Sequence, residues 1–340
     1  MTGGTVTGVQ GPGLAGLAFT DPSLESGVRL GLDRVEELLR DSVRSEYPFV
    51  TETSGHLVSA GGKRFRPLLA LLAAHFGNPA APDVVPAAVV VELTHLATLY
   101  HDDVMDEAMV RRGAVSANAR WDNTVAILTG DFLFSRASSI LADLGPEAVR
   151  IQAHTFERLC TGQILETVGP GPAEDPVAHY LHVITEKTGS LIATSGLFGA
   201  MFAGAPADVV DVVRRYSEAI GVAFQLSDDL IDVTAERAVS GKNPGTDLRE
   251  GVRTLPVLYA LASEDPADAR LRDLLGGPLT DDGLHSEALT LLRSSEAMEQ
   301  ARKTLASYAG RAAMLLADLP DTSARDALSL LVDFVVARTA

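Results

Sequence analysis

Two clusters of three aspartates share one spacing in this sequence. Their members are Asp102, Asp103 and Asp106 in the first cluster and Asp228, Asp229 and Asp232 in the second. Because residues four apart lie on one face of a helix, the first and last carboxylates of each cluster should lie together. Both clusters follow strongly apolar runs, where unpaired carboxylates are costly to desolvate. We therefore expect a cation to lie between the two clusters.

The ligand types indicate which cation this is. Oxygen ligands without His or Cys suit Mg²⁺, which keeps several waters and is commonly held by a few carboxylates together with substrate phosphates. Two facing clusters could therefore clamp a metal-bound diphosphate. A single DDxxD cluster also arises on an ordinary solvated helix face, so the repetition of the cluster on two apolar helices is what favours a functional site.

A basic segment, GGKRFRP, occupies residues 61–67 just before an apolar helical run. It concentrates the cations Lys63, Arg64 and Arg66 in a chain whose formal net charge is -17. Arg makes bidentate phosphate contacts and Lys supplies a point charge, so the segment could bind a second diphosphate. A solvated basic loop is the alternative interpretation.

Further cations lie close to the aspartate clusters in the sequence. Arg111 and Arg112 follow the first cluster within two helical turns and could reach phosphates held there. They could equally pair with acidic residues of the same segment. Lys187, which is followed by Thr188, and Lys242 would neutralise a metal-bound diphosphate near the second cluster.

Amphipathic helices are predicted to position these residues. Between residues 30 and 43, apolar side chains recur at helical spacing with charged residues between them. Comparable patterns are found at 67–76, 84–106, 125–143, 147–168, 177–203, 207–233, 254–263, 285–317 and 323–337. Short Gly and Pro breakers separate them, without an interdomain linker or an alternating strand pattern. We predict an all-α fold, a single-domain bundle of about ten or more helices.

The composition supports helices and argues against several functions. Ala, Leu and Val dominate the 46% of hydrophobic residues and aromatics make up only 5%, which suits close-packed helices better than sheets. The net charge of -17 argues against nucleic acid or an anionic membrane as a nonspecific partner. The single Cys160 excludes an internal disulfide, fits a reducing cytoplasm and is expected to be a buried core thiol.

The start of the chain and its most apolar stretch bear on localisation. Residues 1–25 are expected to form a flexible tail, because this Gly-rich start lacks the basic residues and the apolar run of a signal peptide. Polar residues interrupt the apolar stretch from 84 to 99, so a buried helix is predicted there in preference to a transmembrane span. We expect a cytoplasmic protein.

Six segments resemble the trans-isoprenyl diphosphate synthases, or polyprenyl synthetases, across the chain after residue 30. They are GGKRFRP at 61–67, HDDVMDEAMVRRG at 101–113, GDFLF at 130–134, EKTGSL at 186–191, FQLSDDLID at 224–232 and GKNPGTDLREGVRTLP at 241–256. The resemblance implies that residues 26–340 form a catalytic domain, all-α, around a deep central cavity. It also implies a homodimer and aspartate clusters that face each other across the cavity mouth.

The resemblance further implies roles at the matching positions. Mg²⁺ bridging the allylic diphosphate would be bound by Asp102 and Asp106, with support from Asp103. A further Mg²⁺ would be bound by Asp228, Asp229 and Asp232, for a total of about two to three ions per active site. The allylic diphosphate would be contacted by Arg111, Lys187, Thr188, Gln225 and Lys242. Isopentenyl diphosphate would be held by Lys63, Arg66, Arg112 and His95, with Arg64 adjacent.

The implied reaction proceeds by ionisation, condensation and elimination. Metal ions and cationic side chains stabilise the departing diphosphate, and the isopentenyl double bond attacks the allylic cation. A proton is then lost, for which the released diphosphate is a candidate base, so no Ser/His/Asp or Cys/His constellation is needed. One expected diphosphate contact is missing, because the family often has Lys where this chain has Val252, beside Arg253.

The length of the product should depend on side chains just before the first aspartate cluster. Family members that make short products often have a bulky residue four or five positions before it, where this chain has Ala97 and Thr98. We therefore expect a product of about thirty carbons or more. Any membrane contact is expected to be transient and to accompany product release. Alternatively, Phe156 or Leu159 closes the cavity, which would leave a geranylgeranyl or farnesyl diphosphate synthase.

Two other functions remain as alternatives. A terpene cyclase also uses an aspartate-rich helix and Mg²⁺, but it needs one diphosphate site and an aromatic-lined cavity, whereas this chain has one Trp and an additional basic segment. From a different class comes a noncatalytic partner subunit of a prenyl synthase. Such subunits typically lose the acidic clusters, both of which are intact here. Turnover by the purified protein alone would distinguish an enzyme from a noncatalytic subunit.

Overall fold

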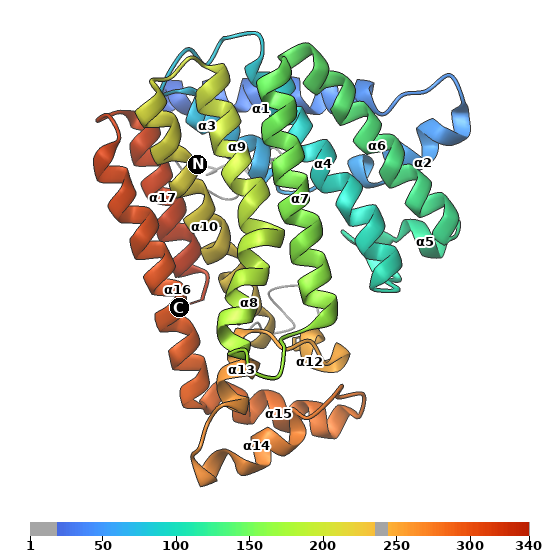
Figure 1. Ribbon diagram of the computed structural model, residues 1–340, viewed down its shortest axis with the longest axis vertical. Helices are drawn as coiled ribbons and strands as arrows, with labels where there is room; N and C mark the ends of the chain where they lie inside the picture. The colour runs from blue at the N-terminus through green and yellow to red at the C-terminus, as the bar shows by residue number, and fades with distance from the viewer. Residues whose placement is uncertain (1–18, 235–243, 340) are drawn as a thin grey trace, which may run out of the picture. The chain divides into compact units, whose positions relative to one another are not determined.

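The computed structural model describes residues 19–234 and 244–339, which are predominantly helical (Figure 1). The all-α prediction is confirmed, because the strands in this described part are two short ones, β1 (Val110–Arg111) and β2 (Ala114–Val115), which pair antiparallel. The chain divides into two compact units. The first lies within Met1–Arg150 and Phe198–Pro206, and the second lies within Ile151–Leu197 and Ala207–Ala340.

The first unit is built around one long apolar helix. Its helices are α1 (Pro22–Ser42), α2 (Pro48–Ser59), α3 (Phe65–Ala74), α4 (Val84–Met105), α5 (Ala117–Arg120) and α6 (Asn123–Leu144). Helix α4 packs against α6, α3 and α1, and nearly every residue from Ala87 to Ala97 is buried. The apolar run before the first aspartate cluster is therefore the core of this unit, as predicted.

The second unit is built around α10 (Ala207–Thr234). The longer helices that surround or follow it are α8 (Pro176–Ile184), α13 (Leu255–Leu261), α15 (Asp282–Ser294), α16 (Glu296–Leu315) and α17 (Ser323–Ala337). Shorter elements are η1 (Thr185–Gly189), α12 (Thr246–Glu250), η2 (Pro266–Asp268), α14 (Ala269–Leu274) and η3 (Leu316–Asp318). Helix α10 packs along α16 and α17 (Figure 1).

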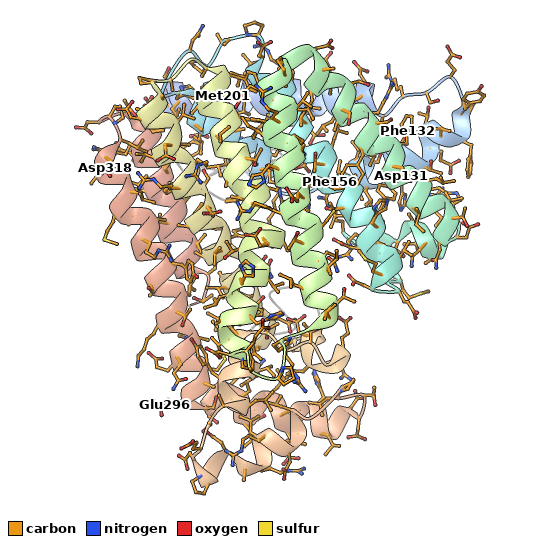
Figure 2. All side chains as sticks on the ribbon, viewed as in Figure 1. Asp131, Phe132, Phe156, Met201, Glu296 and Asp318 are labelled. Carbon is orange, nitrogen blue, oxygen red and sulfur yellow. The ribbon has the colours of Figure 1, made fainter. Side chains whose placement is uncertain are left out.

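Two helices run from one unit into the other. They are α7 (Pro146–Val168) and α9 (Ser190–Phe202). Cys160 lies exposed on α7, so the expectation of a buried core thiol is wrong. Figure 2 labels Phe156 on the same helix, and Leu159 there is buried.

Capping residues explain where several helices begin. The Asp21 carboxylate accepts hydrogen bonds from the backbone N–H groups of Ser23 and Leu24, and Pro22 takes the first helical position, so α1 begins within the predicted tail. Asp175 caps α8 in the same manner, again before a proline. These local signals explain why α1 starts at residue 22 and not near residue 30.

Three other predicted boundaries differ from the structure. Helix α2 was not predicted, because its apolar residues cluster at its two ends without helical spacing between them. The pattern at 177–203 contains the π-helical turn η1, which the period of apolar residues does not reveal. The pattern at 285–317 comprises two helices, because Ser295 has an extended backbone between α15 and α16.

Two helices, α4 and α6, are long and apolar enough to span a membrane by length and composition alone. The apolar window of α4 is 67% buried, as expected for the core helix of a globular unit, in agreement with the prediction for this stretch. The window of α6 is only 33% buried, so this helix leaves apolar surface uncovered.

Candidate functional site

The first aspartate cluster lies at the C-terminal end of α4. Asp103 is fully buried, Asp102 is half-buried and Asp106 is exposed just beyond the last helical residue. The buried Tyr100, one turn before the cluster, ties α4 to α2 by donating its hydroxyl to the carbonyl of Thr53 at 2.6 Å. The end of α4 is thereby held in place on its core side.

Arg111 is bound to this cluster. Its Nε donates to Asp103 Oδ1 at 2.5 Å, and its Nη2 lies 3.5 Å from Asp106 Oδ2. Burial raises the pKa of Asp103, and the Arg111 guanidinium opposes that rise. Arg111 therefore partners the carboxylates in this structure, which was the alternative to a direct phosphate contact.

Arg112, the next residue along the chain, contacts the basic segment. The hairpin of β1 and β2 reverses at Arg112 and Gly113, both of which have a positive φ. Arg112 Nη1 donates to the carbonyl of Gly61, at the start of GGKRFRP. Successive residues of one hairpin thus contact the aspartate cluster and the basic segment.

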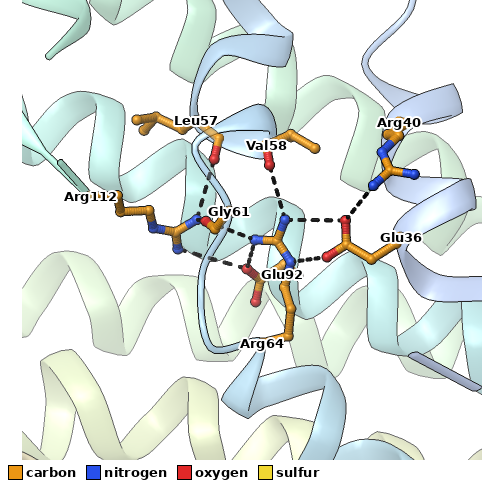
Figure 3. A network of polar contacts seen from close by, with 8 residues as sticks. All are labelled: Glu36, Arg40, Leu57, Val58, Gly61, Arg64, Glu92 and Arg112. Atoms are coloured by element: carbon orange, nitrogen blue, oxygen red, sulfur yellow. Dashed lines mark hydrogen bonds and ion pairs between the residues drawn. The ribbon is translucent and has the colours of Figure 1, made fainter. Parts of the chain in front are cut away.

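The cations of the basic segment have different environments. Lys63 is exposed, whereas Arg64 is buried and donates to both Glu36 and Glu92 (Figure 3). Arg66 Nε is buried and lacks a hydrogen-bond partner within the described part of the chain. Burial lowers the pKa of Arg66 to about 10. Arg66 thus remains cationic at neutral pH with unused hydrogen-bonding capacity.

His95 lies among these arginines. Burial first, and then the charges of Arg66, Arg112 and Arg64, hold the pKa of His95 well below its ordinary value. Its imidazole is therefore neutral at pH 7 and can donate one hydrogen bond and accept another. Basic side chains and a neutral imidazole together make a site suited to an anion.

The second aspartate cluster lies near the C-terminal end of α10. Asp229 is buried and accepts hydrogen bonds from the Tyr180 hydroxyl and, at 3.0 Å, from Gln225 Nε2. Burial raises the pKa of Asp229 to about 7 in spite of these donors. A nearby cation would favour its ionised form.

The other two carboxylates of this cluster have partners from distant segments. Arg338, at the end of α17, donates from Nη2 to Asp228 Oδ1 at 2.5 Å and stacks over Phe224 with its guanidinium carbon 4.8 Å from the ring centre. Asp232 accepts from the backbone N–H groups of Thr246 and Asp247, each at 3.2 Å. These partners orient the carboxylates of Asp228 and Asp232.

The π-helical turn η1 contains two further predicted diphosphate contacts, Lys187 and Thr188. Lys187 Nζ donates to Glu166 Oε2 at 2.5 Å, and Thr188 Oγ1 donates to Gln225 Oε1 at 3.3 Å. Gly162 permits the close approach of α7 to η1, since a Cβ added to Gly162 would lie 2.6 Å from the backbone nitrogen of Lys187. Such π-turns frequently mark functional sites.

Two further positions were singled out in the sequence, Lys242 and Val252. Lys242 lies outside the described residues. Val252 is 45% exposed, and its neighbour Arg253 is also exposed. The prediction that Lys242 contacts the diphosphate stays a prediction.

The carboxylates fit a metal that is held jointly with substrate. Within residues 19–234 and 244–339, no three or more His, Cys, Asp or Glu side chains gather into a metal cage. Mg²⁺ does not need one, because a few carboxylates, waters and substrate phosphates usually complete its shell. Asp103 Oδ2 is buried and has no hydrogen-bond partner in the described structure, so positive charge near this end of α4 would be favourable.

Several residues at these sites were not identified from the sequence. Tyr180, Glu92, Glu166 and Arg338 each contact a predicted site residue from a distant part of the chain. None belongs to a cluster or follows a motif at short spacing. Charged residues within otherwise apolar helices were the available signal, and Glu92 in α4 is the clearest example.

The side chains at the predicted wall positions are small. Ala97 is fully buried, and Thr98 is half-buried with its hydroxyl donating to the His95 carbonyl at 2.8 Å. Neither position carries a bulky group at this level of α4. The sequence prediction about product length therefore still rests on these two positions.

Known proteins resemble the chain along most of its length. A family model described as polyprenyl synthetase matches residues 47–292. A nonaprenyl diphosphate synthase from Mycobacterium tuberculosis is 52% identical over 326 residues, which cover 96% of this chain and 97% of that protein.

Solved structures match equally well. A geranylgeranyl pyrophosphate synthase from Corynebacterium glutamicum, complexed with calcium and isoprenyl diphosphate, has a TM-score of 0.87 and 48% identity, and the match covers 95% of this chain and all of that one (100%). A decaprenyl diphosphate synthase from Rhodobacter capsulatus has a TM-score of 0.84 and 36% identity, with coverage of 94% and 99%.

Proposed function

This chain belongs to the polyprenyl synthetase family and is a trans-prenyltransferase, and from that premise we propose that it adds isopentenyl diphosphate to an allylic diphosphate to make a long-chain polyprenyl diphosphate. One observation carries the assignment of its two substrates. The hairpin places Arg111 on the first aspartate cluster and Arg112 on the basic segment. These contacts support two neighbouring diphosphate positions, one beside the first aspartate cluster and one beside the basic segment.

The site of isopentenyl diphosphate is assigned to Lys63, Arg66, Arg112 and His95. Arg66 has a buried nitrogen without a partner in the described residues, and Lys63 is exposed and can reach an incoming phosphate. The neutral His95 can donate a hydrogen bond to the same diphosphate. Arg64 is already bound by two carboxylates, so its role in our proposal is to hold the site together.

The allylic diphosphate is assigned to the two aspartate clusters and their cations. Mg²⁺ would be held by the carboxylates of Asp102, Asp106, Asp228 and Asp232. We expect about two to three ions per active site. Bound Mg²⁺ would neutralise charge on the leaving diphosphate. Thr188 is linked to Asp229 of the second cluster through Gln225, and its neighbour Lys187 is paired with Glu166. Both side chains could exchange these partners for phosphate oxygens.

The chain's own residues then act by position and charge. Cationic side chains on both sites stabilise the negative charge that develops on the leaving group, and the apolar α4 core beneath Asp103 keeps water from the allylic cation. The catalytic set in this proposal comprises the six aspartates with Arg111, Lys187 and Lys242. A cytoplasmic homodimer is the expected form of the enzyme.

A product of about thirty carbons or more is proposed from the small residues on α4. Ala97 and Thr98 leave room where a bulky side chain would stop the growing chain. The relative that is 52% identical is a nonaprenyl diphosphate synthase, which agrees with this proposal. A geranylgeranyl diphosphate synthase remains the second candidate, because the structural neighbour at 48% identity is one.

Turnover by the purified protein tests the proposal. The protein is incubated with labelled isopentenyl diphosphate, Mg²⁺ and, separately, dimethylallyl, geranyl, farnesyl or geranylgeranyl diphosphate, and the dephosphorylated products are sized. We expect a ladder that ends at about thirty carbons or beyond and that disappears when EDTA removes the metal. A ladder that stops at geranylgeranyl length would support the second candidate. No incorporation with any primer would contradict the proposal and favour a noncatalytic partner subunit.

A further inference from the structure

A buried carboxylate lies at the centre of the arginines of the basic segment. Glu92 belongs to the apolar helix α4 and is 2% exposed. Its Oε1 accepts from Arg64 Nη1 at 3.0 Å and lies 3.8 Å from Arg112 Nη2 (Figure 3). A charged residue at such a depth requires a reason, because an unpaired carboxylate there would be strongly disfavoured.

Glu92 offsets repulsion between neighbouring guanidinium groups. Burial and the charge of Arg112 both lower the pKa of Arg66, and Glu92 raises it. Burial likewise lowers the pKa of Arg112, whereas the charge of Glu92 opposes this. One carboxylate therefore stabilises the charged forms of two residues that we assign to isopentenyl diphosphate.

Arg64 connects this carboxylate to the backbone of the basic segment. Its guanidinium also donates to Glu36, to the carbonyl of Gly61 at 3.4 Å and to the carbonyl of Val58 in α2 at 3.1 Å, so most of its donors are used. Arg64 itself has a left-handed backbone, with a φ of 48°. This conformation is uncommon for a non-glycine residue, and the bonds made by the Arg64 side chain help to offset its cost.

The turn that follows from this conformation touches Arg112 directly. A Cβ added to Gly62 would lie 2.9 Å from Arg112 Nη1, and that nitrogen donates to the carbonyl of Gly61. The position of Arg112 and the path of residues 61–64 thus depend on each other. Glu92 is paired with both Arg64 and Arg112, so it connects the two arginines.

We propose that Glu92 is a positioning residue for the isopentenyl diphosphate site, with Glu36 as its outer support through Arg64. This inference rests on the proposed function of that site. Glu92 does not touch the substrate in this proposal. It holds Arg64 and Arg112 in place and offsets the repulsion between neighbouring guanidinium groups, so that binding of the diphosphate does not require the arginines to be assembled at that moment.

The substitution Glu92→Gln tests the proposal. Gln keeps the shape and one acceptor but removes the charge, so the arginines repel one another and the turn loses its anchor. We expect the KM for isopentenyl diphosphate to rise about tenfold, with the KM for farnesyl diphosphate and kcat changed by less than about twofold. A merely structural role would not separate the two substrates in this way.

Two further variants supply a graded comparison and a control. Glu36→Gln removes the outer carboxylate, which is 17% exposed and contacts Arg64 but not Arg112, so a smaller rise of about threefold in the same KM is expected. Glu25→Gln breaks an exposed pair with Arg29 on α1 and should leave both KM values unchanged. If Glu92→Gln does not fold, Glu36→Gln decides the question.

The outcomes separate this inference from the proposed function. Turnover by the wild-type protein comes first, and its absence would overturn the proposed function itself. With wild-type turnover established, an unchanged or lowered KM for isopentenyl diphosphate in Glu92→Gln would overturn only the positioning role. A lowered KM would mean that Glu92 mainly repels the diphosphate. Equal rises in both KM values would also contradict it, because they would indicate general disruption.

Discussion

Individual residues at these sites owe their chemistry to partners that neutralise or desolvate them. Burial raises the pKa of Asp229 to about 7, although the hydrogen bonds donated by Tyr180 and Gln225 lower it. Burial lowers the pKa values of Arg66 and Arg112, and the charge of Glu92 opposes this in both. The same residue types on the surface would have ordinary properties, so environment determines what these side chains can do.

His95 yields a prediction about pH. The folded protein holds this imidazole neutral, whereas the unfolded chain binds a proton below about pH 6.5. The unfolded state therefore gains protons as the pH falls through this range, and wild-type stability should decrease by roughly 1 kcal/mol between pH 6.5 and 5.5. The variant His95→Gln removes this contribution, so its free energy of unfolding should depend less on pH in urea titrations.

The same variant has a kinetic readout. Because His95 is neutral, Gln can supply a similar hydrogen bond, and the KM for isopentenyl diphosphate should stay within about threefold of wild type at pH 7.5. His95→Ala, which has no donor, serves as the comparison and should raise that KM further. If the stability of His95→Gln followed the wild-type pH curve, the assignment of a neutral His95 would be wrong.

Ala97 yields a prediction about product length. This residue is fully buried and small, and Phe at the same position should block the growing chain below the first aspartate cluster. We expect Ala97→Phe to shorten the longest product toward the length of farnesyl or geranylgeranyl diphosphate, as sized by chromatography after dephosphorylation. Unchanged products would show that another residue ends the cavity, for which Phe156 and Leu159 are the candidates.

At the scale of elements, close approaches between helices position the functional side chains. The first aspartate cluster lies where α4 ends against α2, and the hairpin brings two arginines from beyond that end back to the site. In the second unit, α7 lies against the backbone of η1 at Gly162. The positions of Lys187 and Thr188 therefore depend on a glycine in a different helix.

The substitution Gly162→Ala tests this dependence. The added Cβ would lie 2.6 Å from the backbone nitrogen of Lys187 and 3.0 Å from the Cα of Lys187, so η1 and α7 must move apart. We expect a loss of roughly 1 to 3 kcal/mol in unfolding free energy and a higher KM for the allylic substrate.

Gly310→Ala in α16 is the matched control. It adds the same methyl group to a helix where no heavy atom lies within 4 Å, so it should be neutral or stabilising by up to about 1 kcal/mol. If both substitutions had the same effect, the close contact of α7 with η1 would not be what positions Lys187.

At the scale of the whole molecule, charge and exposed apolar surface are the features to explain. The chain carries a net charge of -17, yet Arg64, Arg66, Arg111 and Arg112 lie at the sites that we assign to diphosphates, so attraction of substrate has to be local. On α6, Ile127 is 43% and Leu128 is 60% exposed within an apolar window. Uncovered apolar residues on an otherwise apolar helix are typical of an interface.

We expect this face of α6 to form the homodimer contact. Ile127→Asp together with Leu128→Asp should convert a dimer into a monomer in sedimentation velocity, because charges would be desolvated at the interface. Met314→Asp, which changes a residue 70% exposed on α16, should leave the dimer intact. A wild-type protein that sediments as a monomer would contradict the expectation.

The sequence alone determined the helical fold, the two aspartate clusters and the basic segment, because helical periodicity and motif spacing are local properties of the chain. It also predicted α4 as a buried helix. Only the tertiary structure decided which polar and charged side chains pair with one another. Arg64 and Glu92 are 28 positions apart, Tyr180 and Asp229 are 49 apart, and Arg338 and Asp228 are 110 apart. Pairings over such separations depend on how helices pack, which no local pattern records.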